Sequence, residues 1–98
     1  MIDPSGIPVP RTGVRFEELD GEAVVYDRSG KRASYLNETA TVIWKLCNGT
    51  NTVPDIVGVL AKEYPEEATG IANDVRETIE RLVQERLVVF AKTAAVGG

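Results

Sequence analysis

The sequence predicts an α+β domain in which a three-stranded antiparallel sheet packs on a bundle of three helices. Residues 14–36 alternate β-rich segments with tight-turn signals, and residues 38–86 carry apolar side chains at helical spacing. The chain has 98 residues, of which 43% are hydrophobic and 27% charged, and this is typical of one globular domain with one core. Three strands alone leave an apolar face that only the helices can cover, so sheet and helices share that core.

The sheet is expected to be a meander. Residues 14–19 and 22–27 form its first two strands, because Asp20-Gly21 between them tolerates the positive φ angles of a type I′ hairpin turn. A second turn at residues 28–31 leads to a short third strand over residues 32–36. We expect this third strand at an edge of the sheet.

Two helices with clear start and stop signals follow the third strand. Asn37 caps the first helix, which ends at Asn48-Gly49, where glycine suits the left-handed position. The second helix starts at Thr52, where Asp55 completes an approximate capping box, and it ends before Pro65.

The third helix begins between residues 66 and 69 and ends near Arg86, and residues 87–90 form a possible last extended segment. The chain before the sheet is rich in proline and glycine and shows no sustained period. The expected domain spans residues 14–90, between a flexible lead-in at residues 1–13 and a flexible tail at residues 91–98. This order of elements is winged-helix-like, with the sheet moved to the front.

The composition argues against an enzyme, a metal site and a bound cofactor. The chain has no histidine, which removes the usual general base near neutral pH. Its one cysteine, Cys47, cannot form an intrachain disulfide or a thiolate cluster, and we expect it to be a small buried side chain. Trp44 on the same helix face is expected to anchor the core.

The charge balance disfavours nucleic acid as a partner. With 11 basic and 15 acidic residues, the net charge of −4 offers no surplus for phosphates. Residues 38–64 could form a helix–turn–helix, but the second helix offers Lys62 against Asp55 and Glu63. The amino terminus lacks a secretory signal and no stretch approaches membrane-spanning length, so we expect a cytoplasmic protein without membrane contact. A winged-helix DNA-binding regulator remains the alternative.

The third helix has an apolar stripe that spans roughly 140°, wider than the ~100° that one buried face requires. Its members are Ile71, Ala72, Val75, Thr78, Ile79, Leu82 and Val83. Either both rims of the stripe pack in the core, or one rim stays open and lines a groove. The edge strand at residues 32–36 offers unpaired backbone groups, to which an extended peptide can add as another strand. The basic turn at Arg28, Lys31 and Arg32 either protects this edge or steers an acidic peptide towards it.

From Val14 onward the chain resembles the PqqD family, small peptide-binding proteins of pyrroloquinoline quinone biosynthesis with homologues in other modified-peptide pathways. The matching segments are VRFEELDGEAVVYD, YLNETATVIWKLCNGTNTVPDIVGVLAKEY and IANDVRETIERLVQERLV. The most specific part runs from Leu36-Asn37 to Asp55-Ile56. The family often has Asp-Gly where this chain has Asn48-Gly49, and Gly-Leu where this chain has Arg86-Leu87.

The resemblance implies a recognition element that binds the leader of a ribosomally made precursor peptide and hands it to a radical S-adenosylmethionine maturase. In that family the leader adds to the third strand and lies against the third helix. Carried onto this chain, the strand residues are Arg32, Ala33, Ser34, Tyr35 and Leu36, and the helix residues are Asp74, Val75, Thr78, Ile79 and Leu82. The expected protein is a peptide chaperone, monomeric or weakly dimeric, without enzymatic activity. A docking domain that serves only a protein partner is a third possibility.

Overall fold

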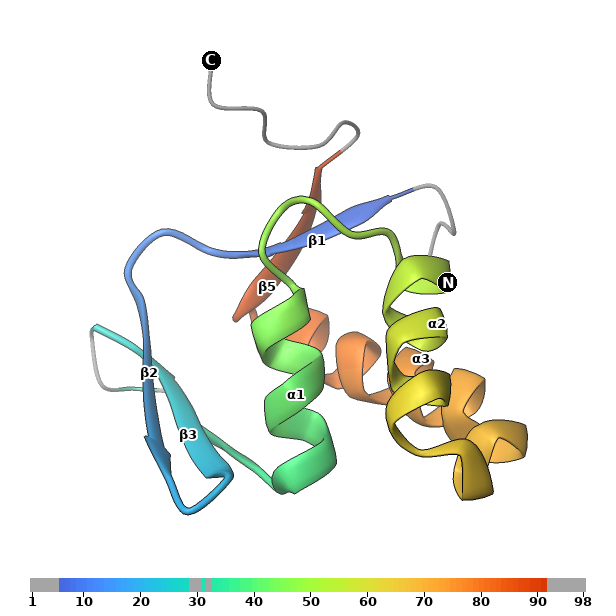
Figure 1. Cartoon of the computed structure of the whole chain (residues 1–98). Helices are drawn as coiled ribbons and strands as arrows, with labels where there is room; N and C mark the ends of the chain where they lie inside the picture. The colour runs from blue at the N-terminus through green and yellow to red at the C-terminus, as the bar shows by residue number, and fades with distance from the viewer. Residues whose placement is uncertain (1–5, 29–30, 32, 92–98) are drawn as a thin grey trace.

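A three-stranded antiparallel sheet packs against three helices, as predicted, and a second sheet of two strands joins segments near the two ends of the chain (Figure 1). The structure is a computed structural model that describes residues 6–28, 31 and 33–91. The elements are β1 (Ile7–Pro10), β2 (Val14–Leu19), β3 (Glu22–Asp27), β4 (Ala33–Leu36), α1 (Glu38–Leu46), α2 (Val53–Glu63), a 3₁₀ turn (Pro65–Glu67), α3 (Ala68–Gln84) and β5 (Val88–Ala91).

The hairpin of β2 and β3 confirms the predicted turn. Asp20 and Gly21 have φ angles of 55° and 83°, and positive values at both central residues define type I′. Strand β3 lies between β2 and β4, so β4 is an edge strand. The predicted third strand included Arg32, which lies outside the described residues.

The helix caps read from the sequence are present. The side chain of Asn37 accepts a hydrogen bond from the Ala40 amide at 2.8 Å and so caps α1. Thr52 and Asp55 form the capping box of α2, with the reciprocal hydrogen bonds at 3.2 and 2.9 Å.

Helix α3 ends in a Schellman motif. The amide of Leu87 donates to the Leu82 carbonyl at 2.9 Å, and the amide of Arg86 donates to the Val83 carbonyl at 3.0 Å. Arg86 reaches this geometry with a φ of 62°, a left-handed conformation that favours glycine. The motif turns the chain sharply from α3 into β5 and brings Leu87 into the core.

The prediction of a flexible lead-in is wrong for residues 7–10, which form β1 and pair with β5. The Arg11 amide donates to the Leu87 carbonyl at 3.0 Å and continues this ladder at every second residue. Pro8 and Pro10 therefore occupy the alternate positions, where a backbone N–H is not needed. Ile7, which is 7% exposed, joins the core. The lead-in at residues 1–5 and the tail at residues 92–98 lie outside the described residues.

The core consists of two clusters that meet along α1 and α3. The cluster beneath the three-stranded sheet contains Ala23, Val25, Leu36, Ala40, Trp44, Leu82, Leu87 and Val88. The cluster between the helices contains Ile43, Cys47, Val53, Ile56, Leu60, Ile71, Val75 and Ile79. Trp44 anchors the first cluster as predicted and stacks on Phe16, with ring centroids 6.2 Å apart. No helix in the described part of the chain is long and apolar enough to cross a membrane.

Candidate functional site

The candidate site is the free edge of β4. The two-residue turn pairs Leu19 with Glu22, and the register then directs the backbone groups of Glu22 and Val24 towards β2. Ala23 and Val25 consequently face β4, where their partners are Leu36 and Ser34. Since backbone direction alternates along a strand, the N–H and C=O groups of Ala33 and Tyr35 point to the free edge.

The side chains of β4 alternate in the same way. Ser34 is 6% exposed and Leu36 is wholly buried, whereas Ala33 and Tyr35 are exposed on the outer face of the sheet. The hydroxyl of Tyr35 is hydrogen-bonded to Glu22, and this bond raises the pKa of the phenol above its ordinary value. On that outer face, Leu19, Val24 and Tyr35 border a shallow hollow of about 170 Å³. The strand thus offers an aromatic side chain beside its open backbone groups.

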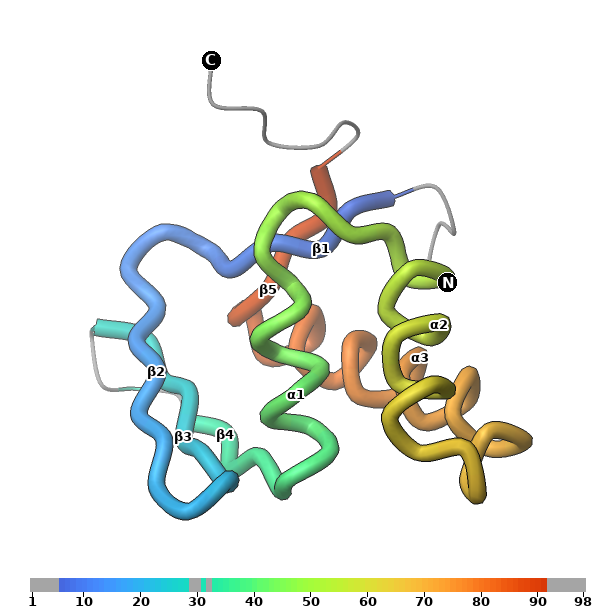
Figure 2. Tube along the Cα trace, viewed as in Figure 1, coloured from blue at the N-terminus to red at the C-terminus, as the bar shows by residue number. Residues whose placement is uncertain are grey.

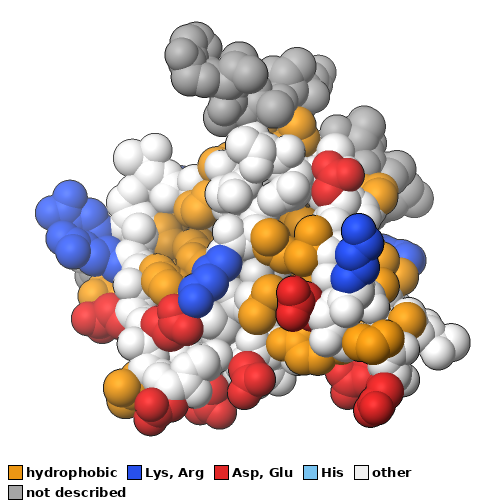
Figure 3. All heavy atoms as spheres, in the orientation of Figure 1, with side chains coloured by type: hydrophobic (Ala, Val, Ile, Leu, Met, Phe, Trp, Pro, Cys, Tyr) orange, Lys and Arg blue, Asp and Glu red, His pale blue; other side chains and the backbone are white. Residues whose placement is uncertain are grey.

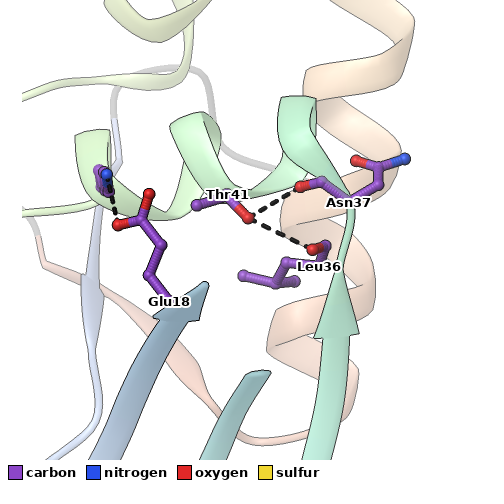
Figure 4. A network of polar contacts seen from close by, with 5 residues as sticks. Glu18, Leu36, Asn37 and Thr41 are labelled. Atoms are coloured by element: carbon purple, nitrogen blue, oxygen red, sulfur yellow. Dashed lines mark hydrogen bonds and ion pairs between the residues drawn. The ribbon is translucent and has the colours of Figure 1, made fainter. Parts of the chain in front are cut away.

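The end of β4 is held firmly against the helices (Figure 4). The buried hydroxyl of Thr41 on α1 donates to the carbonyls of Leu36 and Asn37, at 3.3 and 2.8 Å. At the opposite edge of the sheet, Glu18 of β2 forms an ion pair of 2.6 Å with Lys45 of α1. The Thr41 contacts connect the end of β4 to the start of α1, and the Glu18–Lys45 pair connects β2 to the same helix.

Helix α3 contacts the free edge of β4 through one arginine. The guanidinium of Arg81 donates from Nη2 to the carbonyl of Tyr35 at 3.2 Å. Asp74, Thr78 and Glu85 share this rim of the helix with Arg81, because they are three, four or seven residues away. The opposite rim carries Val83, which packs on both core clusters. The rim of α3 beside β4 is therefore the one that contains Thr78 and Arg81.

The wide apolar stripe of α3 is explained by packing. Val75, Ile79 and Leu82 are wholly buried, because the helix packs against the sheet cluster on one side and the helix cluster on the other. Of the helix residues inferred from the resemblance, Asp74 is exposed and Thr78 is half-buried. The accessible rim beside β4 is polar, in contrast to the open apolar rim considered from the sequence.

Sequence reasoning missed Arg81. Glu77 and Glu85 lie four residues before and after Arg81, a spacing typical of ion pairs on the outer side of a helix, but the structure directs the guanidinium to the strand instead. The available signal was that Arg81 follows Thr78 by three residues and so lies on the same rim. Glu85 has a related peculiarity, since its Oε1 atom is buried without a hydrogen-bond partner among the described residues.

Comparisons with known proteins agree with this architecture. The family model described as Coenzyme PQQ synthesis protein D (PqqD) matches residues 22–88, from the start of β3 to the start of β5. A PqqA binding protein of Kluyvera intermedia is 31% identical over 85 residues, covering 84% of this chain and 88% of the relative. A PqqA binding protein of Methylococcus capsulatus is 47% identical over 71 residues, covering 72% of each chain.

A solved structure shows the same fold. TbiB1, in its complex with the TbiA(beta) leader peptide, superposes with a TM-score of 0.72 and covers 82% of this chain and 93% of TbiB1. At 20% identity the likeness concerns the fold alone. The family match and the two relatives carry the assignment further, since all three cover most of the chain and the relatives are 31% and 47% identical to it. The chain belongs to the PqqD family.

Proposed function

We propose that this chain is a non-catalytic chaperone for a ribosomally made precursor peptide, whose leader binds as an added strand on the free edge of β4. The observation that carries the proposal is the outward direction of the Ala33 and Tyr35 backbone groups beside α3. The relatives named PqqA binding proteins and the leader-bound state of TbiB1 support the same interpretation. Because such peptides are made by ribosomes, the proposed place of action is the cytoplasm.

The residues proposed for the site fall into two groups. Direct contacts come from the accessible ones: the backbone of Ala33 and Tyr35, and the side chains of Asp74 and Thr78. Arg32, which the resemblance adds to this group, lies outside the described residues. The buried ones are Ser34, Leu36, Val75, Ile79 and Leu82, and their role is indirect, because they anchor β4 and α3 in the core beneath these contacts. Backbone hydrogen bonds supply affinity in this mode, and side chains on the helix supply specificity.

The sharpest test removes one backbone donor from the free edge. Tyr35→Pro deletes the outward N–H, and Tyr35→Ala is the matched control, because it loses the same side chain but keeps that donor. Binding of a synthetic PqqA peptide, followed by calorimetry, should be about three- to tenfold weaker for the proline variant than for the alanine variant. Equal affinities of the two variants would contradict strand addition at β4.

Amide shifts locate the binding surface independently. Titration with the same peptide should move the NMR signals of residues 33–36 and of the α3 rim that contains Thr78. Shifts confined to α2 would point to a different site. Ser34→Pro serves as a control for sheet damage, because the Ser34 amide faces β3 and its loss weakens the ladder rather than the free edge.

The second part of the proposal is transfer of the bound peptide to a radical S-adenosylmethionine maturase. A chain without histidine, whose one cysteine is buried, leaves the chemistry to another protein. The maturase should retain the chain in a pull-down, with retention unaffected by Tyr35→Pro. A maturase that modifies the peptide equally well without this chain would contradict the transfer role.

Light scattering tests the accompanying proposal of a monomer or weak homodimer.

A further inference from the structure

Arg81 occupies the backbone acceptor that an added strand needs. Its Nη2 atom donates to the carbonyl of Tyr35, which points to the free edge of β4. A peptide strand pairing with this edge presents its own N–H to the same carbonyl. We propose that Arg81 is a specificity-determining residue, which leaves the Tyr35 carbonyl when the peptide binds and pairs with a carboxylate of that peptide.

The side chain of Arg81 is suited to such an exchange. It is exposed, so its movement disturbs no core packing, and its planar guanidinium matches the geometry of a carboxylate. In the free protein the hydrogen bond keeps an edge carbonyl occupied, and a positive charge at a sheet edge also discourages pairing with other chains. Once the peptide N–H has replaced it, the guanidinium lies beside the bound strand and requires a new acceptor.

A peptide carboxylate satisfies the displaced guanidinium better than the acidic residues of its own helix. Glu77 and Glu85 lie one turn away on either side of Arg81. A pair with the exposed Glu77 contributes little, and Glu85 is half-buried, with its Oε1 atom out of contact with solvent. A carboxylate on the added strand can accept two parallel hydrogen bonds from the guanidinium, and the peptide itself shields the pair from water. The ligand is thus an extended peptide with Asp or Glu close to the residue that pairs with Tyr35.

The charge distribution along the sheet favours the same chemistry. Arg28 and Lys31 are exposed near the start of β4, whereas Asp20 and Glu38 are exposed near its end. Figure 3 shows Lys and Arg side chains gathered at the left edge of the molecule and acidic side chains along its lower edge. An acidic residue on an added strand is therefore attracted to the half of β4 that lies between the basic turn and Arg81.

This inference rests on the proposed function, and a cycle of variants separates the two. The protein variants are Arg81→Gln and, as the control, Arg76→Gln, which removes the same charge from the opposite side of α3. The probes are synthetic PqqA and a copy in which every Asp and Glu is replaced by Asn and Gln. Affinities of all combinations are measured at low and high salt, and circular dichroism checks that each variant is folded.

Arg81→Gln should bind the acidic peptide about three- to tenfold more weakly than the unchanged protein. It should bind the amide peptide equally well or more tightly, because no guanidinium then competes for the Tyr35 carbonyl. Arg76→Gln should leave the ratio of the two affinities unchanged. Single amide replacements in the peptide then identify the one position whose effect disappears in Arg81→Gln.

The outcomes distinguish the two proposals. If the unchanged protein binds neither peptide, the proposed function fails for this ligand. If it binds, and Arg81→Gln weakens both peptides by the same factor, or no more than Arg76→Gln does, the role assigned to Arg81 is overturned while strand addition stands.

Discussion

At the scale of single residues, Arg86 shows how a local departure from the family pattern is accommodated. The resemblance implied that glycine is frequent here, and the structure gives the reason, since the residue adopts a φ of 62° at the end of α3. Arginine tolerates this conformation because the two hydrogen bonds of the Schellman motif and the burial of Leu87 hold it in place. The strain is stored in one residue and leaves the helix end intact.

Arg86→Gly should therefore stabilise the domain. Removal of the left-handed strain contributes about 1 kcal/mol, part of which is offset by the greater freedom of glycine in the unfolded chain, so a net gain of about 0.5 kcal/mol is expected. Arg86→Val should instead destabilise the domain, because a β-branched residue fits the left-handed conformation poorly. Urea unfolding of the three proteins measures their order of stability. A glycine variant less stable than the natural protein would contradict the inference that Arg86 is strained.

Cys47 gives a prediction for alkaline pH. Burial raises the pKa of its thiol from 9.0 to about 12, so the folded protein retains the proton at pH values where the unfolded chain has lost it. The corresponding stability is fully present below pH 9 and is lost as the pH rises towards 12. Between pH 8 and pH 10.5, the free energy of unfolding should fall more steeply for the natural protein than for Cys47→Ala. Parallel pH profiles of the two proteins would contradict a buried, neutral thiol.

At the scale of elements, the strands and helices differ in how far their sequence determines them. The Asp20-Gly21 turn and the caps at Asn37 and Thr52 are local devices, and each was correctly predicted because all its partners are close in the chain. Strand β1 was not predicted, because its pairing with β5 joins residues far apart in sequence. Its prolines are also typical of a loop. The alternation of Pro8 and Pro10 with Ile7 and Val9 was the available signal for a strand bonded on one side.

Ile7→Ala tests whether β1 is a structural element. Because Ile7 is 7% exposed, its truncation should lower the free energy of unfolding by about 2 kcal/mol, at the lower end for buried isoleucines. Val89→Ala is the control within the same sheet, since Val89 is 44% exposed and its truncation should cost less than about 0.5 kcal/mol. Similar values for the two variants, measured by thermal or urea unfolding, would mean that β1 adds no stability.

At the scale of the whole molecule, the sequence predicts the order of sheet and helices but not the division of the core. Every apolar position of α3 was identified, yet its wide stripe was compatible both with an open groove and with packing on two sides. Only the placement of α1 and α2 decides between these two arrangements. Val75 and Ile79 belong to the helix cluster, and Leu82 belongs to the sheet cluster. For the same reason the sequence does not predict the contact of Arg81 with β4, since the partner of its guanidinium, the Tyr35 carbonyl, is 46 residues away.

The pairing of β1 with β5 has a practical consequence for protein engineering. Ile7 and Ala91 are direct partners in this small sheet, so the first and last strands of the described region end at neighbouring points. Figure 2 shows this sheet at the top of the molecule, away from β4. The folded unit can consequently be inserted into a surface loop of a host protein, or circularly permuted through a short linker, with the free edge of β4 left unobstructed.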